Sequence, residues 1–90
     1  MEQSTSDLII HGLSIFPESN GNWRIRSTIR TGNVIPGQEL LFSTPNGKKY
    51  SLMVIDKRDG PSRHVTLVVQ GDEEAISSFQ GGFYLFGKNG

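Results

Sequence analysis

Three arginines in one segment carry the side chains best suited to binding chemistry. Arg24, Arg26 and Arg30 occupy even positions in the run from Trp23 to Arg30. Because alternate residues of a β-strand point to opposite faces, this spacing places all three guanidinium groups on one side of a sheet. Arginine binds phosphate through paired hydrogen bonds and can stack on a nucleic-acid base. The same pattern is also typical of a solvated strand face, where charge opposes aggregation.

A phosphate-loop motif is imitated near the C-terminus but is incomplete. Residues 82–89 read GFYLFGKN, whereas the motif requires Ser or Thr at its last position to bind magnesium. The four middle residues, FYLF, are typical of a strand, whereas a phosphate loop must expose its backbone amides. The sequence therefore predicts no nucleotide site.

The residues offer little for catalysis or metal binding. The absence of cysteine excludes disulfides, thiolate zinc sites and cysteine nucleophiles. The two histidines, His11 and His64, have no third ligand at metal-binding spacing. A Ser–His–Asp set for hydrolysis could be assembled from Ser62, His64 and Asp59, so hydrolysis at His64 stays an alternative. The G-x-S-x-G nucleophile elbow, however, is missing. We therefore expect a protein that is not an enzyme and that holds no metal or cofactor.

The composition fits one small globular domain. The chain has 90 residues, of which 34% are hydrophobic, and 9 Lys and Arg balance 9 Asp and Glu. Zero net charge argues against nucleic-acid binding driven by bulk charge. The bases nevertheless concentrate in residues 24–63, which hold eight of them against three acids. This basic segment between acidic flanks fits either a docking face for an anionic partner or a spread of charge for solubility.

Alternation of apolar and polar residues predicts short strands almost throughout the chain. The expected strands cover residues 8–16, 23–30, 39–43, 49–56, 64–70 and 83–86. An Asn-Gly pair at 46–47 predicts the tight turn of a hairpin, and residues 57–63 resemble a polar loop. Asp72 is expected to cap the only helical turn. The prediction is an all-β fold, a small six-stranded antiparallel barrel with one short helical turn.

The predicted barrel occupies most of the chain. Residues 8–87 are expected to form a single domain, between a flexible polar N-terminus at 1–7 and a short tail at 88–90. On the second strand Trp23 lies on the face opposite the arginines, so we expect it to be buried. The N-terminal residues lack the apolar segment of a signal peptide, and no stretch approaches the ~20 apolar residues of a membrane helix. We therefore expect a cytoplasmic protein that does not bind membranes.

Two segments carry a family resemblance. The first is IRTGNVIPGQEL at 29–40, and the second runs from VTLVVQG at 65–71 through Ile76 to GGF at 81–83. Both resemble the second, β-barrel domain of translational GTPases such as elongation factor Tu. In that family glycines close and open the corresponding strands, so the resemblance implies structural roles for four glycines: Gly32, Gly37, Gly71 and Gly81. These 90 residues contain no GTPase domain, so the resemblance does not imply GTP hydrolysis.

The residues and the resemblance lead to one function hypothesis and one alternative. We expect a non-catalytic binding module whose ligand is a macromolecule, in the first place a partner protein. In the resembled family this barrel contacts aminoacyl-tRNA or ribosomal RNA, although none of those contact residues is matched here. The alternative is therefore a module that binds RNA or the ribosome through Arg24, Arg26 and Arg30.

Overall fold

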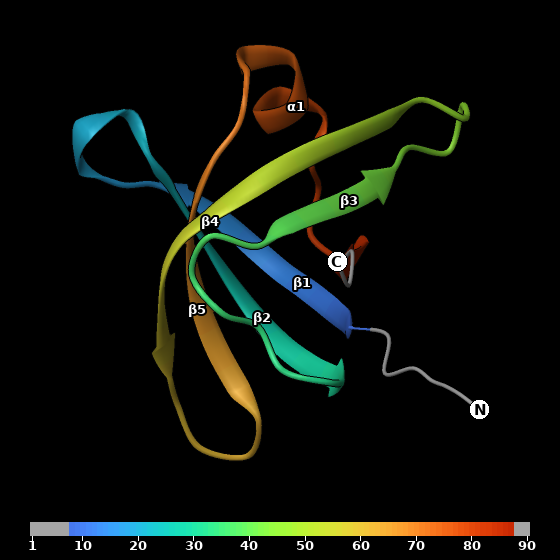
Figure 1. Cartoon of the computed structure of the whole chain (residues 1–90). Coiled ribbons are helices and arrows are strands. Elements are labelled where there is room, and N and C mark those ends of the chain that lie inside the picture. Colours follow the sequence, from blue (N-terminus) through green and yellow to red (C-terminus); the bar gives the residue numbers. More distant parts are fainter. Residues whose placement is uncertain (1–7, 88–90) are drawn as a thin grey trace.

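Six antiparallel strands close into a barrel in the computed structural model, which describes residues 8–87 (Figure 1). The strands are β1 (Leu8–Pro17), β2 (Trp23–Thr31), β3 (Glu39–Ser43), β4 (Lys49–Asp59), β5 (His64–Gln70) and β6 (Tyr84–Gly87). Around the barrel they follow the order β1-β2-β5-β4-β3-β6, so the short strand β6 joins β1 to β3. The predicted six-stranded antiparallel barrel is confirmed. The flexible N-terminus expected at 1–7 and the tail expected at 88–90 lie outside the described residues.

The barrel interior is filled by alternate side chains of every strand, as the period of a strand requires. Its buried aliphatic core includes Ile10, Ile25, Leu40, Leu52, Leu67 and Leu85, one from each strand. The rings of Phe42, Tyr50, Phe79 and Phe83 pack together beside them. Phe42 is the centre of this aromatic group, because its ring lies 5.4 to 6.1 Å from the three others.

A six-residue helix, α1 (Glu73–Ser78), lies beside β4 (Figure 1). The Asp72 carboxylate accepts a hydrogen bond of 2.8 Å from the amide of Ala75, which confirms the expected cap. Ala75 and Ile76 are buried in the core. Within residues 8–87 no helix is long and apolar enough to cross a membrane.

Three register shifts interrupt the alternation of the strands. Leu13 has no paired residue on β2, because the register passes from the pair Gly12–Ser27 directly to the pair Ser14–Arg26. In the same way, Arg30 of β2 is skipped in the pairing with β1, and Ile55 of β4 is skipped in the pairing with β5. A β-bulge of this kind adds one residue to one strand and redirects the side chains beyond it.

The bulge at Ile55 explains one wrong prediction. Residues 57–59 were expected to start a polar loop, but they continue β4 and pair with β5, with Lys57 opposite Leu67 and Asp59 opposite Val65. The alternation seen up to Val54 changes phase at the bulge, so the polar residues after it resemble a loop in the sequence. The connection between β4 and β5 is therefore only residues 60–63.

The inward face of β2 agrees with the predicted alternation. Ile25, Ser27 and Ile29 are buried there. Trp23 packs against the same core but is only half-buried, less than expected. It is the first residue of β2 and pairs with Pro17, the last residue of β1, so it lies at the end of the strand pair.

The four glycines singled out in the sequence all have structural reasons. Gly32 and Gly37 adopt positive φ angles of 83° and 92°, which a side chain would strain. A Cβ atom on Gly71 would collide with the Leu52 side chain, and one on Gly81 would collide with the carbonyl oxygen of Leu13. These positions shape the turns and the close approaches that close the barrel.

Candidate binding surfaces

The outside of the barrel has two faces of different chemistry. Because β6 lies between β1 and β3, and β5 lies between β2 and β4, the surfaces centred on β6 and on β5 are on opposite sides of the barrel. We call the first the apolar face, formed by Ile9, His11, Leu41, Tyr84 and Phe86. We call the second the arginine face, formed by Arg24, Arg26, Arg58, Thr66 and Val68.

The apolar face is a cross-strand group of side chains, of which Leu41, Tyr84 and Phe86 are exposed and the other two are half-buried. Phe86 is 47% exposed and stands directly opposite Ile9 on β1 and Leu41 on β3, which is itself 40% exposed. Two residues away on β6, the exposed ring of Tyr84 stacks on His11, with centroids 4.7 Å apart and planes at 17°. Residues directly opposite each other in a sheet point to the same side, so these side chains form one continuous strip.

A shallow depression of about 400 Å³ adjoins this strip. Tyr84 and Phe86 line one part of it, and Pro45 and Phe83 line another. Its walls thus extend the apolar face toward the turn between β3 and β4.

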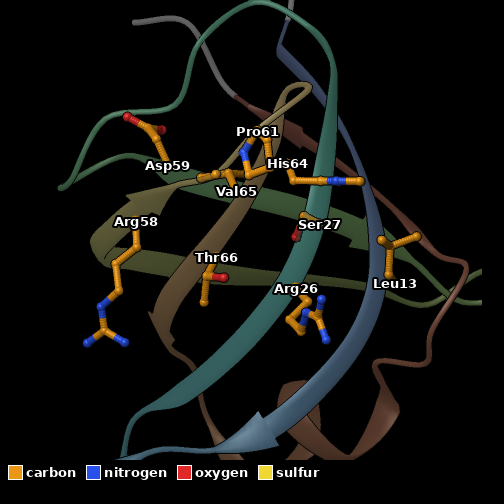
Figure 2. A pocket seen from close by; sticks show the side chains of 10 residues that line it. Leu13, Arg26, Ser27, Arg58, Asp59, Pro61, His64, Val65 and Thr66 are labelled. Carbon is orange, nitrogen blue, oxygen red and sulfur yellow. The ribbon is translucent and has the colours of Figure 1, made fainter.

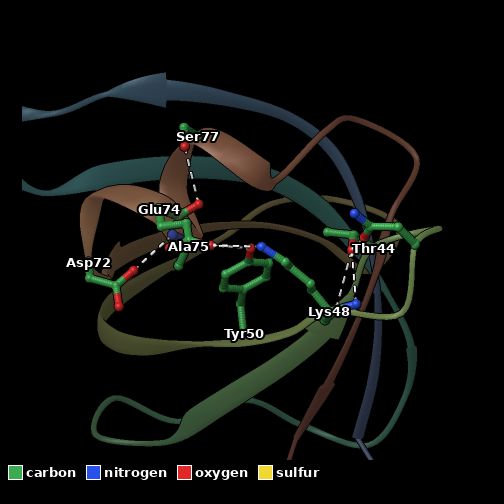
Figure 3. Close-up of polar contacts among 8 residues, drawn as sticks. Thr44, Lys48, Tyr50, Asp72, Glu74, Ala75 and Ser77 are labelled. Atoms are coloured by element: carbon green, nitrogen blue, oxygen red, sulfur yellow. Dashed lines mark hydrogen bonds and ion pairs between the residues drawn. The ribbon is translucent and has the colours of Figure 1, made fainter.

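A second, more polar depression of about 460 Å³ lies between that turn and α1. The hydroxyl of Tyr50 donates a 2.7 Å hydrogen bond to Glu74, whose carboxylate is also 3.6 Å from the Lys48 ammonium (Figure 3). The Thr44 hydroxyl accepts from the Lys48 amide at 3.2 Å. The contacts of Glu74 with Tyr50 and Lys48 join the helix to the β3–β4 hairpin, whose turn borders the apolar face.

The arginine face is built from a second cross-strand row. Thr66 on β5 stands between Arg26 on β2 and Arg58 on β4. Figure 2 shows these three side chains around one depression of about 320 Å³, which His64 and Asp59 also line. Arg58 was missed at the sequence level, because it lies beyond the bulge in residues that resemble a loop.

The three arginines singled out in the sequence have different surroundings. Arg24 lies above the ring of Phe16, 5.6 Å from its centroid, and its Nη1 is 3.4 Å from the Glu18 carboxylate. Arg26 lines the depression beside Arg58 and makes no ion pair with residues 8–87. Arg30 is exposed at its bulge and does not line this depression. The structure therefore groups Arg24 and Arg26 with Arg58 instead of Arg30.

The residues considered for catalysis lie near each other without forming a linked set. His64 and Asp59 both border the arginine-face depression, but in the described part of the chain no hydrogen bond joins their side chains to each other or to Ser62. The neighbouring Arg63 has a structural role. Its side chain donates to the carbonyl oxygens of Ile29 at 3.0 Å and Gly32 at 3.2 Å, which ties the β4–β5 turn to the end of β2.

Comparisons with protein-family models, with curated proteins and with solved structures find no match to this chain.

Proposed function

We propose that the protein is a non-catalytic binding module that docks a partner protein on its apolar face. The supporting observation is the row of Ile9, Phe86 and Leu41 across three neighbouring strands, in which Phe86 and Leu41 are exposed and Ile9 is half-buried. Contiguous exposed apolar side chains mark interaction surfaces, and aromatic residues are enriched at the centres of protein interfaces. None of the five side chains of this face is acidic or is a lysine or arginine, so covering them requires little desolvation of charge.

The strip is suited to binding because its backbone is already ordered. β6 pairs with β1 on one side and with β3 on the other, so barrel hydrogen bonding fixes the positions of Phe86 and Leu41. A surface that is rigid before binding loses less conformational entropy when a partner arrives. The stacking of Tyr84 on His11 restricts a further ring in the same way.

The size of the strip fits the centre of an interface. A fully buried Phe or Tyr covers roughly 150–250 Å², so each half-exposed ring here offers on the order of 100 Å². A standard interface buries about 800 Å² on each partner, of which a few central residues carry most of the affinity. We therefore expect Phe86 and Leu41 to be energetic centres, with more polar strand residues such as Ser43 and Ser51 around them.

The RNA alternative uses the opposite side of the barrel. Arg26 and Arg58 border one depression there, which supports contact with a phosphate group. Arg24 and Arg58 are both partly neutralised by Glu18, which argues against the RNA alternative. Loss of the captured partner after nuclease treatment is the result that would favour this alternative.

The proposal predicts that capture of the partner protein depends on the apolar face. We expect the immobilised protein to retain a protein partner from a nuclease-treated lysate of its own cells, and the double variant Leu41→Thr/Phe86→Thr to retain at least tenfold less. Residues at interface centres often contribute a factor of ten or more each, and threonine keeps the preference for a strand. The measurement is the amount of each retained protein by quantitative mass spectrometry.

Ile35→Thr is the matched control. Ile35 is 62% exposed, the highest value among the exposed large hydrophobic residues, but it lies in the loop between β2 and β3, outside the apolar face. The control should capture as much partner as the parent. Equal capture by the double variant and the parent would exclude the apolar face as the docking surface.

A further inference from the structure

One carboxylate joins two strands of the arginine face. Glu18 lies in the connection between β1 and β2, and its Oε1 accepts from Nη1 of Arg24 at 3.4 Å. Its Oε2 accepts from Nη2 of Arg58 at 3.3 Å. The side chain of Glu18 is only 20% exposed. The two arginines belong to β2 and β4, which are separated by β5. The two contacts of Glu18 therefore link strands that are not neighbours in the barrel.

The bridge covers the strand between the two arginines. On β5, Val65, Leu67 and Val69 are buried inward, so alternation directs Val68 outward. Val68 stands between Arg24 and Asp56 in the register, yet it is only 4% exposed. An outward valine on a barrel surface is hidden only when other side chains lie over it. The burial of Val68 thus agrees with a Glu18 bridge that closes over β5.

We propose that Arg24 and Arg58 form a phosphate site, which Glu18 occupies until a phosphorylated side chain of a partner protein displaces it. Arg26 and Thr66 complete the site on its other side. Neighbouring strands are about 4.8 Å apart, so the Cα atoms of Arg26 and Arg58 are roughly 10 Å apart across Thr66. A phosphate above the Thr66 hydroxyl is within reach of both long side chains.

The charge of the ligand decides between phosphate and carboxylate. Glu18 belongs to the same chain as the two arginines, so its carboxylate is present beside them at a high effective concentration. A carboxylate on a free ligand has the same charge and therefore competes poorly with Glu18 for the arginines. A phosphate monoester carries a charge of about −1.5 to −2 at pH 7 and three acceptor oxygens. It can therefore bind Arg24 and Arg58 and still accept hydrogen bonds from Arg26 or Thr66. Glu18 provides one charge and two oxygens only.

The acids on the same side of the barrel favour a single phosphate over a nucleic acid. Asp56 pairs with the outward Val68, and Asp59 lines the depression beside His64. A chain of phosphates that followed the arginines would pass these carboxylates and be repelled by them. One phosphate between Arg24 and Arg58 meets this repulsion at a single position, beside Asp56, instead of along the whole face. The site lies opposite the apolar face, and the proposal holds whether or not that face binds a partner.

The test compares two variants that remove the same charge. The probe is N-acetyl-phosphoserine methylamide, titrated into the full chain at pH 7 and followed by amide chemical shifts. Glu18→Gln frees both arginines, so we expect it to bind the probe at least fivefold more tightly than the parent. Glu73→Gln makes the same change at an exposed position of α1 and should stay within about twofold of the parent. The largest shifts should fall on residues 24, 58 and 66.

A second variant and a change of pH make the result specific. Adding Arg58→Gln to Glu18→Gln should weaken binding of the probe about tenfold, because a charge-assisted hydrogen bond is lost. Binding to Glu18→Gln should strengthen between pH 5 and 7, since the phosphate gains its second charge near pH 6.

Three results would overturn the proposal. The first is equal affinity of Glu18→Gln and Glu73→Gln for the probe, and the second is a set of shifts away from the arginine face. The third is tighter binding of a ten-nucleotide oligouridylate than of phosphoserine at equal phosphate concentration, which would assign this face to RNA.

Discussion

Replacing Phe42 with alanine is expected to lower the free energy of unfolding by about 3–5 kcal/mol. The ring is buried and lies against those of Tyr50, Phe79 and Phe83, so its removal leaves a cavity among three aromatic side chains. Small domains have a total stability of about 5–15 kcal/mol, so the loss is a large part of it. In thermal unfolding followed by circular dichroism, each kcal/mol corresponds to roughly 4–8 °C for a domain of this size. The midpoint should therefore fall by at least about 12 °C.

Phe86→Ala is the control for this prediction. It makes the same chemical change on the adjacent strand β6, but on the outer face of the barrel. We expect it to cost about 1 kcal/mol or less, because the ring already contacts water over much of its surface. Similar midpoints for the two variants would show that the strands do not face the way described, since a register slip of one residue exchanges the two sides of a strand.

Gly81→Ala is expected to destabilise the barrel by about 1–3 kcal/mol or more. Its new Cβ would collide with the carbonyl oxygen of Leu13, a backbone atom that cannot rotate away. Hydrogen bonds fix the two segments close together, from the Gly12 amide to Phe83 at 2.9 Å and from the Gly82 amide to Gly12 at 2.7 Å. The segment that leads into β6 must therefore shift, and β6 closes the barrel. The measurement is the free energy of unfolding in urea.

Gly60→Ala provides the comparison. Gly60 lies in the turn between β4 and β5, and a Cβ there would meet its nearest neighbour, the carbonyl oxygen of His64, at an ordinary 3.5 Å. We expect a change within about 0.5 kcal/mol. If Gly81→Ala unfolded at the same urea concentration as Gly60→Ala, the close approach of residues 81–83 to β1 would be incorrect.

The strands could be predicted from the sequence because each repeats a local pattern. On β2 the alternation placed Ile25 and Ile29 inside and Arg24 and Arg26 outside, as the structure does. The bulges could not be predicted in this way. An extra residue such as Ile55 is defined only by the register with the partner strand, which a single segment does not contain.

The candidate sites depend even more on distant residues. Ile9, Leu41 and Phe86 adjoin only because β6 closes the barrel between β1 and β3. In the sequence they belong to three separate apolar segments. The bridge from Glu18 to Arg58 joins residues 40 positions apart and was missed for the same reason.

The central claim is that the apolar face docks a protein, and photo-crosslinking tests it most directly. A benzophenone amino acid is placed at position 41 in one sample and at position 35 in another, and nuclease-treated lysate is irradiated with each. Ile35 is more exposed than Leu41, so non-specific reaction would favour position 35. The account predicts a discrete protein adduct from position 41 and none of that adduct from position 35. The same adducts from both positions, or none from position 41, would contradict it.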